Sequence, residues 1–151
     1  MRYMIPAVLV FLTVTAVPAY ASGFDNKIPD QQSIDALATR ASLAPPREQC
    51  FLYAELVHQM TELSMKQYAD GDVEKSASLL KRIQELTRKI HLSVANDNKR
   101  LKNAEILLRR TSFRLTGLLH SSSFEDPTLV AETLAQVNQV QNEAMMRVFR
   151  K

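Results

Sequence analysis

Residues 73–119 read VEKSASLLKRIQELTRKIHLSVANDNKRLKNAEILLRRTSFRLTGLL. The stretch contains no proline, and its single glycine is Gly117, near the end. A turn-forming Asp-Gly-Asp sequence precedes it at residues 70–72, and three serines follow it at residues 121–123. So long a run without helix-breaking residues indicates helical structure through most of its length.

Apolar and small residues recur through this stretch at alternating steps of four and three residues. Such spacing turns one face of a helix toward a neighbouring helix, as in a coiled coil. The seam formed in this way consists of Ser76, Leu80, Ile83, Thr87, Ile90, Val94, Asp97, Leu101, Ala104, Leu108, Thr111, Leu115 and Leu118. Asp97 is the one charged residue in the seam, which therefore predicts a helix packed against other helices.

An Asn-Asp-Asn segment at residues 96–98 interrupts the stretch near its middle. These residues are weak helix formers and could connect two antiparallel helices, which would give a four-helix bundle with a short extra helix in front. The seam favours the other arrangement, because Val94, Asp97 and Leu101 stay in helical phase across the segment. We therefore expect one continuous central helix over residues 73–119, about 70 Å long at a rise of about 1.5 Å per residue.

Three further helices are expected outside this stretch. A first helix should begin after the capping residue Asp30 and end at two consecutive prolines, and a second helix should cover residues 46–69. A capping aspartate followed by proline, Asp126-Pro127, should begin a last helix that reaches almost to the end of the chain.

The sequence thus predicts an all-α fold, an elongated helical bundle in which antiparallel helices flank the central one. A chain of 151 residues fits one domain, which we place at residues 30–151. The expected core consists of Val57, Met60, Leu80, Ile83, Ile90, Leu101, Leu108, Leu115, Leu134 and Val137.

The N-terminus has the pattern of a secretory signal peptide. Arg2 precedes an apolar run at residues 4–17, and small residues then lead to a cleavage site before Ser22. The apolar run is shorter than a membrane span requires. We expect a signal peptide at residues 1–21, a flexible tether at residues 22–29, and a periplasmic or secreted protein with no stable membrane span after cleavage.

Cys50 is the only cysteine in the chain. A small exported protein that depended on disulfides would contain an even number of cysteines, so the apolar core must hold this fold together. We expect Cys50 to be a buried small hydrophobe, with an intermolecular disulfide or a reactive thiol as the alternative.

The sequence pattern that most resembles a metal site is a Glu-x-x-His element at Glu55 and His58, with Glu62 one turn later. Carboxylate-bridged di-iron bundles need two such elements and two further glutamates, all directed inward. Here there is one element, and helical phase places its residues opposite the apolar stripe of their helix. A small metal-dependent enzyme that uses these three residues is the alternative function. The interpretation we favour has no cofactor and no catalytic activity, because the sequence contains no phosphate loop, nucleophile elbow or zinc-protease motif.

The turn at residues 68–76 resembles the inter-helix turn of tetratricopeptide repeats, in which a Gly-Asp pair precedes a small residue. The resemblance ends at Ile83 and Arg88, where that family has a small residue and a proline, and no second copy follows. We therefore interpret this segment as a helical hairpin of no particular family. In organisation the whole chain resembles small exported all-helical bacterial proteins of unassigned function.

One face of the stretch combines positive charge with apolar residues that point away from the seam. Its members are Lys99, Arg100, Lys102, Ile106, Arg109, Arg110, Phe113 and Arg114. Coverage of Ile106 and Phe113 by the first or last helix is the interpretation we favour; the alternative is a contact with an anionic partner.

These patterns predict a non-enzymatic binding or scaffolding protein of the cell envelope. Export would separate it from chromosomal DNA, so we expect no nucleic-acid partner and, for the basic face, an envelope protein or an anionic surface. The sequence leaves a homo-oligomer possible.

Overall fold

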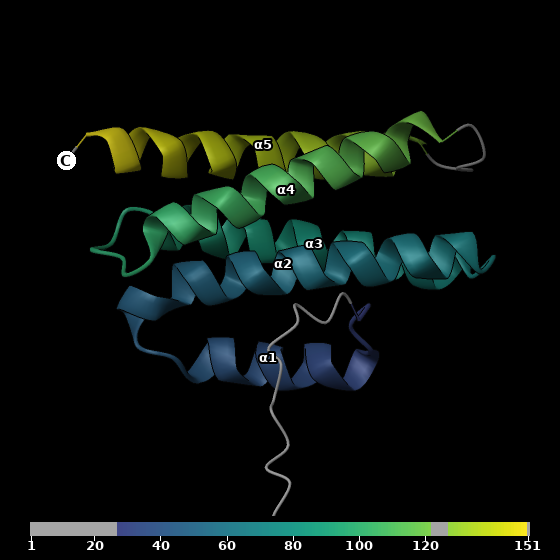
Figure 1. Cartoon of the computed structure of the whole chain (residues 1–151), viewed down its shortest axis with the longest axis horizontal. Coiled ribbons are helices and arrows are strands. Elements are labelled where there is room, and N and C mark those ends of the chain that lie inside the picture. Colours follow the sequence, from purple (N-terminus) through teal and green to yellow (C-terminus); the bar gives the residue numbers. More distant parts are fainter. Residues whose placement is uncertain (1–26, 122–126, 151) are drawn as a thin grey trace, which may run out of the picture.

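A computed structural model of the chain describes residues 27–121 and 127–150. The predicted signal peptide, most of the tether and the capping residue Asp126 lie outside these residues. The described part consists of helices and short connections, with no strand. The helices, in chain order, are α1 (Gln31–Leu43), α2 (Pro46–Ala69), α3 (Val73–Ser93), α4 (Leu101–His120) and α5 (Pro127–Phe149) (Figure 1). The predicted all-α bundle is therefore confirmed.

The expected continuous helix over residues 73–119 is wrong. The chain leaves helical geometry after Ser93, and residues 94–100 form a connection that reverses its direction, so that α3 and α4 run antiparallel (Figure 1). The alternative, a four-helix bundle with a break near residues 96–98 and a short helix in front, is the observed arrangement.

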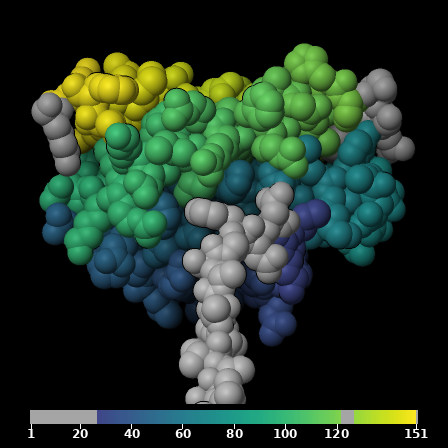
Figure 2. Space-filling view, viewed as in Figure 1, coloured from purple at the N-terminus to yellow at the C-terminus, as the bar shows by residue number. Residues whose placement is uncertain are grey.

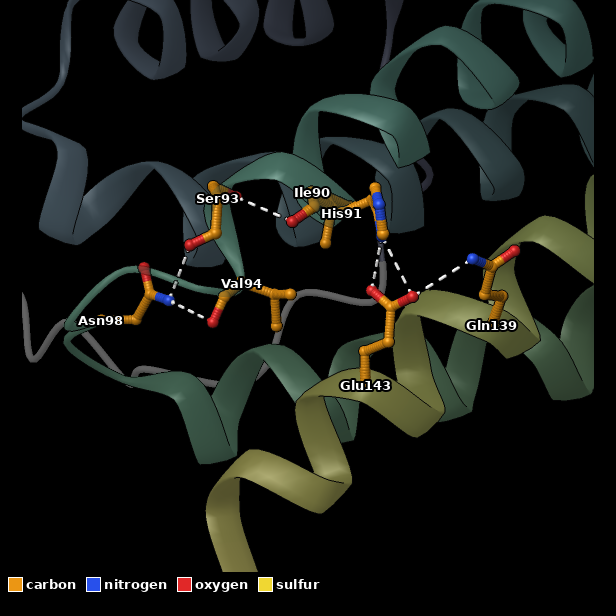
Figure 3. Close-up of polar contacts among 7 residues, drawn as sticks. All are labelled: Ile90, His91, Ser93, Val94, Asn98, Gln139 and Glu143. Carbon is orange, nitrogen blue, oxygen red and sulfur yellow. Dashed lines mark hydrogen bonds and ion pairs between the residues drawn. The ribbon is translucent and has the colours of Figure 1, made fainter. Parts of the chain in front are cut away.

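The side chain of Asn98 caps the C-terminal end of α3, as Figure 3 shows. Its buried side-chain Nδ2 donates hydrogen bonds to the carbonyl oxygens of Ser93, Val94 and Asn96 at 2.9, 3.2 and 3.0 Å. The last carbonyls of a helix have no partner within it, and this amide satisfies them. An asparagine that competes for backbone groups in this way favours a turn over continued helix.

The connection also forms hydrogen bonds and an ion pair with the beginning of α2. The backbone N–H of Lys99 donates to the carbonyl of Arg47 at 2.8 Å, and the Arg47 guanidinium contacts both the carbonyl and the carboxylate of Asp97. Arg100 has a left-handed backbone, with φ of 59°, and its guanidinium lies 3.6 Å from the centre of the Phe51 ring. These contacts exist only in the folded chain and stabilise a backbone conformation that non-glycine residues seldom adopt.

The length of the connection explains why the seam predicted a continuous helix where the chain in fact turns. Val94 and Leu101, which flank it, are both buried, and they are one heptad apart in sequence. A loop of this length returns the chain to the core in the phase that a continuous helix would have kept. Asp97, the charged seam residue, is exposed, and the neighbouring Asn98 is buried in its place.

The four long helices form two hairpins that lie side by side, and the corresponding helices of the two hairpins are parallel. In the first hairpin α2 packs antiparallel to α3, and in the second α4 packs antiparallel to α5. Across the hairpins α2 is parallel to α4, and α3 is parallel to α5. Helix α1 covers the outer side of α2. Helix α2 thus contacts three other helices, and it buries residues over much of its circumference.

The core lies between these helices. Every seam residue except Asp97 is buried, and so is every predicted core residue except Leu134, which is partly buried against the core. The observed boundaries agree with the predicted first, second and last helices, and the Asp30 carboxylate caps α1 by accepting a hydrogen bond from the Ser33 backbone N–H at 2.8 Å.

Candidate functional site

The predicted basic face lies mainly on α4, which runs along the exposed front of the molecule in Figure 2. Lys99 and Arg100 belong to the connection before the helix. Their side chains hold that connection in place, because Lys99 Nζ lies 3.8 Å from a Glu48 carboxylate oxygen and Arg100 stacks on Phe51. Lys99 and Arg100 therefore also contact the body of the fold. The predicted residues that lie on the helix itself, which we call the α4 basic face, are Lys102, Ile106, Arg109, Arg110, Phe113 and Arg114.

Two arginines of the α4 basic face are paired with carboxylates. Arg114 donates to Glu62 of α2 through Nε at 2.7 Å and through Nη2 at 2.9 Å, a bidentate geometry that raises the pKa of Arg114 further above its ordinary value. Arg109 lies 3.6 Å from Glu105, whose side chain is mostly buried toward α5. Glu62 therefore holds the Arg114 guanidinium against α2 and offsets its positive charge.

Phe113 is 77% exposed. Coverage by the first or last helix, the interpretation favoured by the sequence, is therefore wrong for the described helices. The reason is topological: α1 packs on α2, and α5 packs on the other flank of α4, so neither reaches the outward side of α4 at this position. Ile106, two turns earlier, is partly buried.

A shallow pocket of about 400 Å³ adjoins Phe113. Its lining also includes His58 of α2 and three arginines of α4, Arg109, Arg110 and Arg114. Among the described residues Arg110 has no carboxylate within ion-pair distance. The pocket therefore offers an aromatic wall and uncompensated positive charge, a chemistry that suits an anionic group with an apolar neighbour.

The sequence did not identify His58 as a member of this surface. Helical phase placed it on the outer side of α2, but α4 covers that side, and the imidazole is half-buried between the two helices. No local sequence pattern predicts the contact between His58 and α4, because it depends on the parallel arrangement of α2 and α4.

The pKa of His58 is lowered, first by burial of the imidazole, with Arg110 and Arg114 adding repulsion and Glu62 opposing the shift. Its Nδ1 lies 3.1 Å from the Thr111 hydroxyl oxygen, and that hydroxyl already donates its proton to the Leu107 carbonyl. His58 Nδ1–H must therefore be the donor to Thr111, which fixes the neutral tautomer.

The three residues of the alternative metal site have separate partners. Glu55 pairs with Arg40 of α1 at 3.3 Å, His58 contacts Thr111, and Glu62 binds Arg114. Across residues 27–121 and 127–150 no group of three or more histidine, cysteine, aspartate or glutamate side chains is arranged to hold a metal ion.

A second long-range contact that the sequence did not show joins α3 to α5. His91 Nδ1 lies 3.0 and 2.8 Å from the two carboxylate oxygens of Glu143, and Gln139 Nε2 donates to the same carboxylate at 3.1 Å (Figure 3). Local spacing gives His91 no acidic neighbour, so only the pairing of two distant helices supplies one. The contact holds the C-terminal ends of α3 and α5 together.

Cys50 is buried and free, as expected for a small hydrophobe. Burial raises the pKa of its thiol to about 11, and a hydrogen bond with Ser93 only partly opposes this effect. A thiol in this state is a poor nucleophile, which argues against the reactive alternative.

Comparison with known proteins identifies no relative: no protein-family model matches the chain, and no curated protein or solved structure is significantly similar to it. Within the described residues, no helix has the length and apolar character needed to cross a membrane.

Proposed function

We propose that this chain is exported and acts as a non-enzymatic binding or scaffolding protein of the cell envelope, with the α4 basic face as its contact surface for an anionic partner. The observation that supports this most directly is the exposed Phe113 among Arg109 and Arg110. Covering a large exposed aromatic side chain with a partner removes apolar surface from water, which lowers the free energy and favours binding.

The charge distribution supports an anionic partner. The carboxylate on α4 is Glu105, which is mostly buried, so the outward side of this helix presents positive charge alone. Such a surface attracts an acidic envelope protein, an anionic lipid or an anionic glycan through long-range electrostatics, and added salt weakens that attraction.

The contact is tested by binding to three probes: phosphatidylglycerol vesicles, polyglutamate and heparin. Phe113→Ala and Arg110→Ala should each weaken binding to the preferred probe, and both should leave thermal stability unchanged because the two side chains are exposed. Lys81→Ala, which removes an exposed positive charge from α3, is the matched control. Absence of salt-dependent binding to any probe, or equal loss with the control, would reject the α4 basic face as the contact.

Export is tested separately by the mass of the protein recovered from outside the cytoplasm. The proposed cleavage predicts a chain that begins at Ser22. An intact Met1 in that fraction would reject signal cleavage without bearing on the binding surface.

A further inference from the structure

The outward side of α5 differs in composition from the solvent faces of the neighbouring helices. Helix α3 exposes charged residues over its whole length, among them Lys81, Arg82, Glu85, Arg88 and Lys89. Between Glu132 and Arg147 the only charged residue of α5 is Glu143, whose partly buried carboxylate contacts His91 of α3. The exposed residues that line its outward side, which we call the α5 face, are Ala131, Ala135, Asn138, Asn142, Met146 and Phe149.

This composition shares two features with the cores of protein interfaces. Charged side chains are depleted at interface cores, whereas methionine and aromatic residues are enriched there. Met146 is 52% exposed and Phe149 is 80% exposed. Helix α5 uses its opposite side to pack on α3 and α4, and Figure 1 shows it at the outer edge of the bundle, with no described helix beyond it.

We propose that the α5 face binds the same face of a second copy, with the two α5 helices antiparallel about a two-fold axis. The order of residues supports this pairing, because small side chains lie in the first half of the helix and large ones in the second. An axis midway between Asn138 and Asn142 places Ala131 opposite Phe149 of the second copy and Ala135 within one residue of the position opposite Met146. Each contact then occurs twice, as an isologous interface requires.

The same axis pairs polar groups. Asn138 of one copy faces Asn142 of the other, so the amides can exchange hydrogen bonds and set the register. At the flanks Glu132 lies next to Arg147 of the second copy, a contact between opposite charges. A parallel pairing would instead place Glu132 beside Glu132 and Phe149 against Phe149, with gaps at the alanines.

The α5 face also suits a second copy better than the α4 basic face does. Two copies that met through α4 would bring Arg109 and Arg110 against their own equivalents, and like charges in contact are destabilising. The residues of α5 itself, paired in this way, bring no like charges into contact.

The size of the surface sets the expected strength. Helix α5 has 23 residues and is therefore about 35 Å long. One helix face of this length, roughly 10 Å wide, buries a few hundred Å² on each copy, less than the roughly 800 Å² per partner of a standard stable interface. The dimer is therefore weak, and its population rises with protein concentration.

Sedimentation equilibrium over a range of concentrations tests the association. The expected result is a mass that rises toward twice the monomer mass, and Ala135→Glu should weaken dimerisation about tenfold or more by placing a charge at the interface. Ser78→Glu, which adds the same charge to the exposed side of α3, should leave the mass unchanged. A monomer at every concentration, or equal effects of the two substitutions in folded protein, would overturn the proposal.

Disulfide trapping tests the direction. In the antiparallel pairing the double variant Ala135→Cys/Met146→Cys should form a covalent dimer under mild oxidation, because each new thiol faces the other type in the second copy. The single variant Ala135→Cys should not, since its two copies would be about ten residues, or roughly 15 Å, apart along the axis. Buried Cys50 does not interfere. Efficient trapping of the single variant would show a parallel contact and reject the proposed two-fold.

Discussion

The backbone N–H of Lys99 donates a hydrogen bond to the carbonyl of Arg47, at 2.8 Å across 52 residues of sequence. This contact joins the connection between α3 and α4 to the first turn of α2. It belongs to the folded bundle alone, because neither group would have this partner in a continuous helix. The reversal of the chain is therefore stabilised by tertiary contacts as well as by the weak helix formers at residues 96–98.

Replacement of Asn98 by alanine should test how far the turn depends on its cap. Loss of the amide leaves the carbonyls of Ser93 and Val94 without their donor, at a cost of about 1–3 kcal/mol in the free energy of unfolding. Asn96→Ala, at an exposed position in the same turn, should cost less than about 0.5 kcal/mol. Urea denaturation measures both, and equal costs would contradict the capping role.

Ile90→Ala should destabilise the protein by about 2–5 kcal/mol, because the Ile90 side chain is fully buried in the seam. Leu92→Ala, two residues later on the same helix, removes a side chain that is 74% exposed and should change stability by less than about 0.5 kcal/mol. The two free energies of unfolding, measured in urea, should differ clearly. A cost near zero for Ile90→Ala would place the core on another face of α3.

His58 should make the protein less stable at mildly acidic pH. Its pKa is lower in the folded chain than the ordinary value of about 6.5, so the unfolded chain binds its proton more readily. Stability from this group is therefore complete above about pH 6.5 and is lost as the pH falls through the folded pKa. His58→Asn, which retains a donor toward Thr111, should show a smaller loss of unfolding free energy between neutral pH and pH 5.

A control removes the histidine at the end of α4, since His120 contacts the carbonyl of Thr116 in its own helix. His120→Asn should leave the pH dependence of the parent protein in place. If His58→Asn and the parent lose the same stability on acidification, the buried imidazole is not the responsible group.

The Cys50 thiol should be inert in the native protein. Burial and a pKa of about 11 leave almost no accessible thiolate at pH 8, so modification by iodoacetamide should await unfolding. In a Leu43→Cys/Cys50→Ala variant the new thiol is at a position 80% exposed and should react at the rate of a free thiol. Mass spectrometry follows both reactions, and rapid labelling of native Cys50 would show that its site is open.

Much of this fold could be predicted from local patterns. The seam identified the buried faces of α3 and α4, since every member except Asp97 is buried, and the capping aspartate and proline signals located the ends of α1, α2 and α5. Helical periodicity is a property of neighbouring residues, so it can be read without knowing the partner helix. The basic residues of α4 were also identifiable, because charge is a property of each residue.

Only the tertiary structure decided how these helices meet. A continuous helix and a heptad-length turn have the same periodicity, so the break at residues 94–100 depends on contacts from Asn98, Arg47 and Phe51. The exposure of Phe113 and the burial of His58 depend in the same way on which flank of α4 faces α2. These are relationships between segments about fifty residues apart, and no local pattern contains them, because they follow from the free energy of packing whole helix faces together.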